Sequence, residues 1–597
     1  MKKIIVLFSV VFLFMVSCED TFLDLQDLDS VTEAVFFDNP QDFVDGANEF
    51  YRGLHSPQNT NPGNGSAFNR GFAQISDYGT ELNGYFQDYG QGTNLPTAQD
   101  LYWTNAYWYL RDVNTLIQKG DEYVANGGSA SGISESIAAA YFFRAYHHFN
   151  LVKRFGGAPI MTVVPGLGDE ILFSARNSRY EVIEQVLADL DLAIAGLPAT
   201  ATGANLGKIS SIAATAYKAR VLLFEGTWEK YVGTATDFDG SGTANNADAY
   251  IAQAVTVAKT VMDSGDYEIW NQNADPLMEN NSYKWLFSIE GSDSNPGGYT
   301  KASNNEFIIQ TVFDHAANIR IGAIFTQICE SRNAATQPAL DMYSSIDGLP
   351  IAKSPLFQGY AKQSDQFIDR DRRMWANFDA GVAPVDGSFA IPVISNVSNS
   401  NLPNQKFNTW NKYRVTGEES YNYPHLRYAE ILLTYAEALY ERDGSISDAD
   451  LDISVNLIRD RSGIAPLTNA LATTNDLDML EEIRRERTVE LYMENNNHWN
   501  DIRRWNTAVD LLSADIIGAV IEGTEYDVNS PTYDAELFDP AIAVHGFVDD
   551  YPSGVGPVQA LIIDPVGFRP YNLKNYLWPL PLEELVLSPS LVQNPGW

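Results

Sequence analysis

Apolar positions recur at helical spacing through the first half of the chain. One stripe stops at the glycine pair 156–157 and consists of five side chains, Phe142, Ala145, Tyr146, Phe149 and Val152. The next stripe begins after a capping box formed by Ser178 and Glu181 and stops at Gly196. Side chains three and four residues apart share one face of a helix, so both stripes predict amphipathic helices. A further helix is expected from about 248 to 262.

The texture of the chain changes between about residues 271 and 422. This stretch is rich in Gly, Asn, Ser and Pro, and short apolar runs at 285–289 and 307–309 have the composition of strands. Its aromatic residues argue against a flexible linker, because disordered segments contain few of them. We therefore expect a loop-rich insertion in a helical frame.

Helical periodicity returns at Tyr428, and further helices are expected at about 454–461 and 477–495. Small residues such as Ala436 and Ala438 permit close helix approach, so helix pairs of the tetratricopeptide kind are expected, although no strict repeat of roughly 34 residues is found. The fold class predicted is mainly α. Four parts follow along the chain: a leader at 1–17, an N-terminal helical region at 18–270, the insertion at 271–422, and a C-terminal region at 423–597 that forms one compact unit with the N-terminal region.

The N-terminus is typical of a secretory leader. Two lysines precede an apolar run from Ile4 to Val16, which is shorter than the roughly 20 apolar residues that span a bilayer. The order Met15-Val16-Ser17-Cys18 resembles a bacterial lipobox with Met in place of the usual Leu, so we expect Cys18 to be acylated. Acyl chains contribute about 0.8 kcal/mol per buried CH₂ and would hold the protein on a membrane. The alternative is that Cys18 merely ends an ordinary leader.

Composition narrows the function classes. The chain carries 77 acidic against 39 basic residues, a formal net charge of −38, which excludes nucleic acid because binding it requires neutralised phosphates. We expect the acidity to serve solubility at an exposed surface. The only other cysteine is Cys329, so no intramolecular disulfide can form once Cys18 is acylated. A chain this long can bury a sufficient core without one.

Ordered motifs along the chain carry a family resemblance. They include Arg154-Phe155-Gly156-Gly157-Ala158-Pro159, the segment 424–438 and the final Asn594-Pro595-Gly596-Trp597. The set resembles the SusD/RagB family of outer-membrane nutrient-binding lipoproteins over essentially the whole mature chain. The resemblance implies a SusD-like α-helical frame with tetratricopeptide-like helix pairs and a loop-rich ligand-binding face. Arg427 and Glu437 lie in or beside these motifs, and we expect them to tie helices together instead of contacting ligand.

The resemblance also implies a function. A SusD-like protein is expected to capture a glycan or oligosaccharide for a SusC-like TonB-dependent transporter. It is expected at the cell outer membrane, held there through its lipid anchor only and facing the exterior. Glu19 and Asp20, directly after Cys18, resemble the surface-export signal of Bacteroidota lipoproteins. A peptide-binding member of the same family is the alternative within this class.

A loop between residues 77 and 89 has the composition of a sugar site. Sugars present apolar C–H faces ringed by hydroxyls, so aromatic platforms beside carboxylates and amides suit them. The candidate ligand residues here are Asp77, Tyr78, Glu81, Tyr85, Phe86 and Tyr89. The resemblance adds three from the insertion, namely Tyr299, His315 and Arg320. The alternative for each ring is that it packs the loop onto the frame, while Trp103 and Trp108, in an apolar helix, are expected in the core.

Motifs for catalysis are lacking. The seven histidines are scattered without a His-Glu-x-x-His zinc pattern, and no Gly-x-Ser-x-Gly elbow occurs. No enzyme activity or cofactor is therefore expected. A surface glycoside hydrolase is the weaker alternative, because an acidic chain offers many carboxylate pairs. Asp237, Asp239 and Ser241 surround a glycine turn and form a weak candidate for a structural Ca²⁺ site, with an ordinary surface turn as the favoured alternative.

Overall fold

The structure is a computed structural model of the chain. It describes eight stretches of residues, namely 36–54, 79–81, 87–243, 245–317, 319, 333–378, 402–407 and 418–597.

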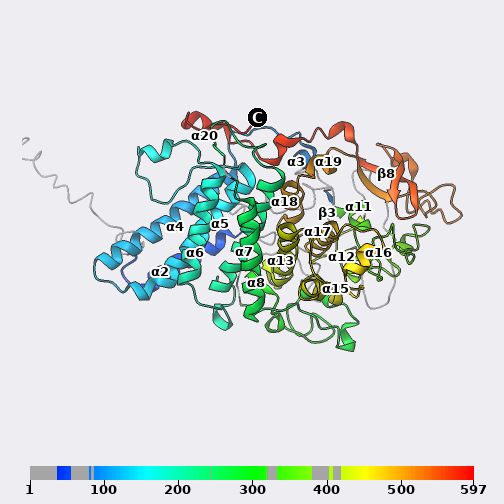
Figure 1. Cartoon of the computed structure of the whole chain (residues 1–597), viewed down its shortest axis with the longest axis horizontal. Helices are drawn as coiled ribbons and strands as arrows, with labels where there is room; N and C mark the ends of the chain where they lie inside the picture. Colours follow the sequence, from blue (N-terminus) through cyan, green and yellow to red (C-terminus); the bar gives the residue numbers. More distant parts are fainter. Residues whose placement is uncertain are drawn as a thin grey trace, which may run out of the picture.

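Long helices packed side by side form the N-terminal half (Figure 1). They are α2 (Pro40–Phe50), α4 (Leu101–Ala125), α5 (Ala130–Phe155), α6 (Arg179–Gly196), α7 (Ser211–Tyr231) and α8 (Ala247–Ser264). Consecutive helices contact one another, which gives the expected pairs. The predicted capping box is confirmed, because the Ser178 side chain accepts from the backbone N–H of Glu181 and the Glu181 carboxylate accepts from that of Ser178.

The glycine pair after α5 has two different roles. Gly156 ends the helix with a φ of 76°, a left-handed conformation that favours glycine. Gly157 has no such φ but lies against a neighbouring chain segment, since a Cβ built on it would be 2.2 Å from the carbonyl oxygen of Asn177. The turn therefore brings the chain directly onto the start of α6.

The C-terminal helices continue the same stack. They are α13 (Tyr428–Asp443), α14 (Asp448–Asp452), α15 (Val455–Ser462), α16 (Asn469–Thr474), α17 (Met479–Glu490), α18 (Asn497–Arg504) and α19 (Ala508–Leu512). Helix α13 packs against α7 and α8 on one side and against α17 on the other (Figure 1). The helices therefore form one continuous, mainly α frame, as the periodicity predicts.

The insertion holds short elements. They are α9 (Ser282–Leu286), β2 (Phe307–Thr311), β3 (Asn333–Ala335), α11 (Gln337–Asp341), α12 (Arg372–Phe378) and β4 (Leu402–Pro403). The strand expected at 307–309 is confirmed as β2, which pairs antiparallel with β5 (Tyr423–Arg427). The strand expected at 285–289 is wrong, because this stretch begins inside α9 and continues as a turn. A short run buried on every side has no periodicity that separates helix from strand.

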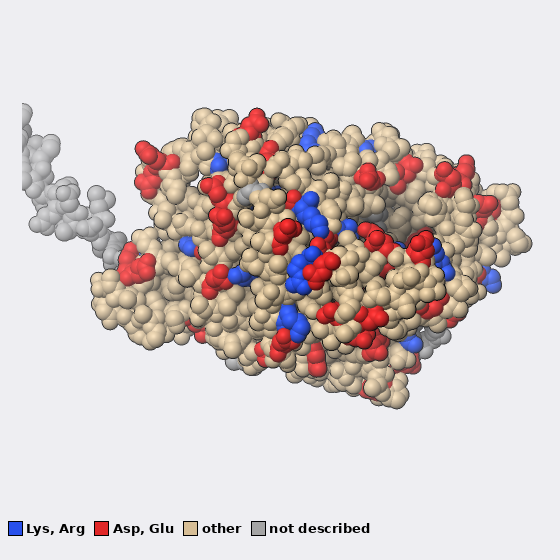
Figure 2. Space-filling view, viewed as in Figure 1, with Lys and Arg blue, Asp and Glu red and all other residues tan. Residues whose placement is uncertain are grey.

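A second β region follows α19. Strands β6 (Ile516–Val520), β7 (Phe547–Ser553) and β8 (Gly556–Asp564) form an antiparallel sheet in the order β6-β8-β7, and α20 (Leu582–Leu587) lies near the C-terminus. This sheet lies at the end of the molecule opposite α2 and α4 (Figure 1). Acidic side chains are spread over the face seen in Figure 2, with fewer basic ones between them.

Candidate functional site

A buried ionic network fastens the insertion to the helical frame. The guanidinium of Arg427 donates to Glu306 at 2.7 Å, to Glu490 at 2.5 Å and to Glu494 at 2.8 Å. Arg461 also pairs with Glu306, at 2.6 Å, and with Glu490. All five side chains are buried. Charges this deep are stable only when paired and hydrogen-bonded, so the expectation that Arg427 ties elements together is confirmed.

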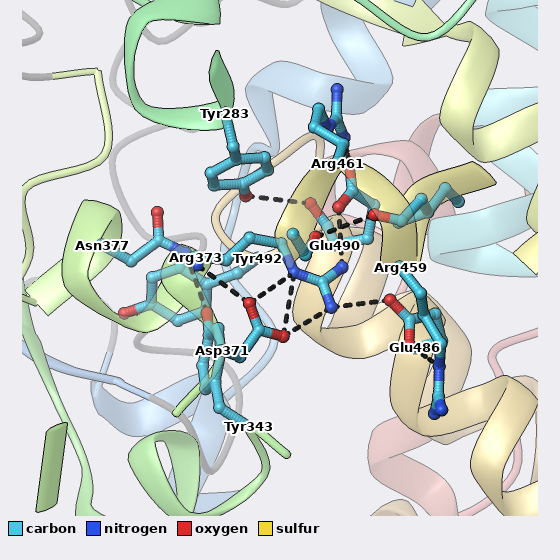
Figure 3. A network of polar contacts seen from close by, with 12 residues as sticks. Tyr283, Tyr343, Asp371, Arg373, Asn377, Arg459, Arg461, Glu486, Glu490 and Tyr492 are labelled. Carbon is cyan, nitrogen blue, oxygen red and sulfur yellow. Dashed lines mark hydrogen bonds and ion pairs between the residues drawn. The ribbon is translucent and has the colours of Figure 1, made fainter. Parts of the chain in front are cut away.

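Arg373 extends the network towards α12 (Figure 3). It pairs with Asp371 and Glu486 at 2.6 Å each and with Glu490 at 2.8 Å. Burial alone would raise the pKa of Glu490, but the guanidiniums of Arg461, Arg427 and Arg373 hold it well below its usual range. This carboxylate therefore stays ionised through the physiological pH range, and its three arginines come from three different segments of the chain.

Lys406 attaches the segment around β4 to the same network. Its ammonium donates to Glu494 at 2.7 Å, to the Tyr492 carbonyl at 2.7 Å and to the Tyr283 hydroxyl at 2.8 Å. Glu437, the other residue expected to be structural, pairs with Arg504 at 2.6 Å and thereby links α13 to α18. These buried charges thus belong to the scaffold.

A three-stranded sheet joins the predicted ligand loop to the insertion. Strand β1 (Gly79–Glu81) pairs antiparallel with β3, with Gly79 opposite Ala335, and β3 pairs with β4, with Ala335 opposite Leu402. Three segments far apart in sequence thus meet at one place. We define this sheet, which consists of Gly79–Glu81, Asn333–Ala335 and Leu402–Pro403, as the candidate ligand face.

Several predicted ligand residues lie outside the described residues. These are Asp77, Tyr78, Tyr85, Phe86 and Arg320, together with the lipidation residue Cys18. The backbone of Glu81 belongs to β1. The roles of these residues therefore stay predictions. Of the stretch 77–89, the structure describes only residues 79–81 and 87–89.

Tyr89 packs the loop onto the frame. It lies in α3 (Gln87–Gln91), and its ring stacks on Trp578 with the ring centres 3.9 Å apart and an interplanar angle of 11°. The guanidinium of Arg154 also lies over the Trp578 ring. Burial raises the pKa of Tyr89 to about 12. Of the two alternatives for this ring the structure shows the packing one, whereas ligand contact by Tyr89 stays a prediction.

Tyr299 and His315 are held by different contacts. The ring of Tyr299 is half-buried against Trp270, and its hydroxyl donates to Asp275 at 3.2 Å. His315 is exposed, and its backbone N–H donates to the Ser420 hydroxyl at 3.0 Å. Lys301 bridges the two regions by donating to the Phe313 carbonyl at 2.6 Å.

The carboxyl group of Glu290, which accepts from the backbone of Ser420, has an unusual environment. Burial raises the pKa of Glu290 to about 8, and the nearby charge of Glu419 acts in the same direction. Lys301 opposes the shift. A carboxyl that holds its proton near neutral pH can act as a general acid, so the Glu290 side chain suits acid–base chemistry.

Trp108 was expected in the core, and this expectation is wrong. Trp103 is 4% exposed, whereas Trp108 is 54% exposed and lines a groove between α2 and α4. The groove also presents Glu49 and Asp112, so an aromatic face lies beside carboxylates. The periodicity contains the signal that was missed, because Trp108 lies outside the buried stripe of α4 that includes Leu110 and Val113.

The weak calcium candidate forms a tight turn. The carboxylate of Asp237 accepts from the Tyr180 hydroxyl at 2.7 Å, and Asp239 is exposed. The Ser241 hydroxyl donates to the Gly242 carbonyl at 3.2 Å. Over the described part of the chain, no three His, Cys, Asp or Glu side chains are arranged to share a metal ion. Calcium binding here stays a prediction.

Comparison with known proteins identifies relatives. The family model described as "SusD family" matches residues 333–597, and the model described as "Starch-binding associating with outer membrane" matches residues 22–223. A SusD-like protein P2 from Formosa agariphila is 26% identical over 454 residues, which cover 72% of this chain and 76% of that relative.

Solved structures share the fold. A SusD-like carbohydrate binding protein from Bacteroides fragilis superposes with a TM-score of 0.66 at 20% identity, covering 93% of this chain and 99% of that one. A laminarin binding SusD-like protein gives a TM-score of 0.56 at 18% identity, covering 94% and 100%. Within the described residues, no helix combines the length and the apolar character that crossing a bilayer requires.

Proposed function

Because this chain belongs to the SusD family, we propose that it captures a glycan or oligosaccharide at the cell surface and passes it intact to a SusC-like TonB-dependent transporter. The observation that carries the proposal is the sheet β1-β3-β4. It joins residues 79–81, which belong to the aromatic stretch 77–89, to residues 333–335 and 402–403 of the insertion. The aromatic and amide residues of that stretch have the chemistry that stacks on and hydrogen-bonds to a sugar chain.

Rigid support for these loops is the second argument. The residues of a ligand site keep their geometry when packed elements support them. Here Arg427, Arg373 and Lys406 hold the insertion through buried ion pairs. The stack of Tyr89 on Trp578 holds the end of the 77–89 loop in the same way. These contacts hold the described ends of the segments from which the proposed ligand residues extend.

The names of relatives favour a carbohydrate ligand. Similar proteins are described as carbohydrate binding and laminarin binding, and one matching family model as starch-binding. Laminarin and starch are accordingly the first probes to use. Affinity electrophoresis in gels that contain each polysaccharide should retard this protein, while casein peptides added as competitors should not relieve the retardation. Retardation by no polysaccharide, together with measurable peptide binding, would favour the peptide-binding alternative.

The proposed anchor is the acylated Cys18 at the outer membrane. Replacing Cys18 with Ala should release the protein from the membrane fraction, because acyl chains supply the membrane affinity that a short cleaved leader cannot. The measurement is fatty-acid labelling of both forms, with Cys329→Ala as the matched control that keeps the lipobox. Equal labelling of wild type and Cys18→Ala would refute the anchor.

A surface glycoside hydrolase is the second candidate, and Glu290 is the observation that favours it. The raised pKa of Glu290, near 8, and the neighbouring Glu419 would suit a general acid beside a second carboxylate. Chromatography of polysaccharides after incubation distinguishes the two functions. Intact polymer supports capture alone, whereas products that vanish in a Glu290→Gln variant would establish hydrolysis.

A further inference from the structure

A polar cavity lies where the N-terminal and C-terminal helices meet. Its wall is formed by side chains of α5 and α7 from the first half and of β5, α17 and α18 from the second. The cavity volume is about 110 Å³. One water occupies roughly 10 to 15 Å³ of such a volume, so the cavity has room for a small molecule of several heavy atoms.

Five cations lie on the polar part of this wall. Lys153, Arg154, Arg220, Arg487 and Arg504 all line the cavity. Each arginine has a carboxylate partner of its own, so its charge is already offset. The four pairs are Arg154 with Asp100 at 3.4 Å, Arg220 with Glu430 at 2.6 Å, Arg487 with Asp501 at 2.9 Å, and Arg504 with Glu437 at 2.6 Å.

Lys153 is the exception. Among the described residues its ammonium makes no hydrogen bond or ion pair, and it lies over the ring of Phe149 at 5.0 Å. Five lining cations therefore face four carboxylates, which leaves one positive charge. Burial lowers the pKa of Lys153 to about 7, with the charges of Arg220 and Arg503 acting in the same direction and that of Glu430 opposing them. The ammonium of this half-buried side chain thus has no ion-pair partner among the described residues.

Unsatisfied amides lie on the same wall. The Nδ2 groups of Asn150 and Asn497 are buried and have no hydrogen-bond partner among the described residues, and the same holds for Oδ1 of Asn496. Asn497 is only 6% exposed. A buried amide N–H without a partner costs free energy, so two such donors beside an unpaired ammonium indicate a missing acceptor.

We propose that this cavity binds one small oxyanion, such as a carboxylate or a sulfate, with Lys153 as its counter-charge and Asn150 and Asn497 as hydrogen-bond donors. An anion there would satisfy the two donors and offset the surplus charge at once. Because the cavity joins both halves of the frame, the bound anion would also stabilise their contact. None of the lining residues belongs to β1, β3 or β4, and the proposal does not depend on the proposed glycan function.

Isothermal titration of the purified protein with sodium sulfate and, separately, sodium acetate tests the proposal. The titrations are run below pH 7, where Lys153 is protonated, with sodium chloride as the reference salt. One site per chain is expected for at least one oxyanion. Lys153→Met should weaken binding by about tenfold or more, because hydrogen bonds to a charged group contribute about 1.5 to 3 kcal/mol. Lys259→Met, which removes an equal charge from an exposed pair on α8, should bind like wild type.

A second measurement covers the case in which Lys153→Met fails to fold. A crystal structure of the wild type grown in ammonium sulfate should show a tetrahedral anion within hydrogen-bond distance of Lys153 Nζ. Density for water only in the cavity would overturn the proposal. So would a Lys153→Met variant that binds sulfate and acetate as tightly as the wild type does. Binding of sulfate without acetate, or the reverse, would identify which oxyanion the cavity accepts.

Discussion

Replacing Arg427 with Met tests whether the buried ionic network stabilises the fold. Met matches the length of the Arg stem but removes donors to Glu306, Glu490 and Glu494. Each carboxylate keeps at least one other cation: Glu306 keeps Arg461, Glu490 keeps Arg461 and Arg373, and Glu494 keeps Lys406. Removing one partner from a buried ion pair costs about 3 to 5 kcal/mol, and this is the expected loss in the free energy of unfolding.

The expected change in melting temperature follows from the size of the chain. Unfolding entropy is about 2.1 cal/mol/K per residue, so the 597 residues give about 1.2 kcal/mol/K if the protein unfolds as one unit. A loss of about 3 to 5 kcal/mol then lowers the melting temperature by about 2 to 4 °C. Scanning calorimetry resolves a shift of this size.

The matched control is Arg442→Met. Arg442 pairs with Asp443 at the surface, with the two side chains 38% and 43% exposed, so its removal should leave the melting temperature unchanged. A double variant, Arg427→Met with Glu490→Gln, should lose less stability than the two single changes together, because their losses share one interaction. An Arg427→Met protein that melts with the wild type would refute the structural role of the network.

Three further outcomes are expected. Tyr89→Ala should lower the free energy of unfolding by about 1 to 2 kcal/mol in urea titration, because the ring stacks on Trp578; an unchanged midpoint would mean the stack contributes nothing. Burial lowers the pKa of His148 from 6.5 to about 3. Between these pH values the unfolded state binds a proton and the native state does not, so the free energy of unfolding should decrease as the pH is lowered from 6.5 to about 3. The His148→Gln variant should show a smaller fall in urea titrations across this range, and equal falls would contradict the assignment. Gly157→Ala should lower the free energy of unfolding by about 1 to 3 kcal/mol, because its Cβ would meet the Asn177 carbonyl at 2.2 Å. A calorimetric melting temperature equal to that of the wild type would show that the turn can relax.

The helices were predictable because their signals are local. Periodicity and the Ser178–Glu181 capping box place α6 within a few residues of its observed bounds, and the helix expected at 248–262 is α8. Trp108 differs from the prediction because an apolar residue in an apolar helix favours the core, whereas its position around α4 faces away from the core. The same periodicity, applied residue by residue, places it outside the buried stripe.

The long-range features had no local signal. Nothing in the sequence near 79–81 indicates that β1 pairs with β3 more than two hundred residues later, since such short strands depend on their partners. Arg427 and Glu490 could be recognised as structural only through the family resemblance, because charged side chains are seldom fully buried. The cavity beside Lys153 depends on five separate elements and could not be inferred from any one of them.

The most direct test of glycan capture is a crystal structure of the protein with the oligosaccharide that affinity electrophoresis selects. The sugar is expected on the candidate ligand face, against the loops carried by β1, β3 and β4, with its glycosidic bonds intact. Sugar rings bound only at the Trp108 groove, or a cleaved sugar beside Glu290, would contradict the proposal that this face captures a glycan without hydrolysing it.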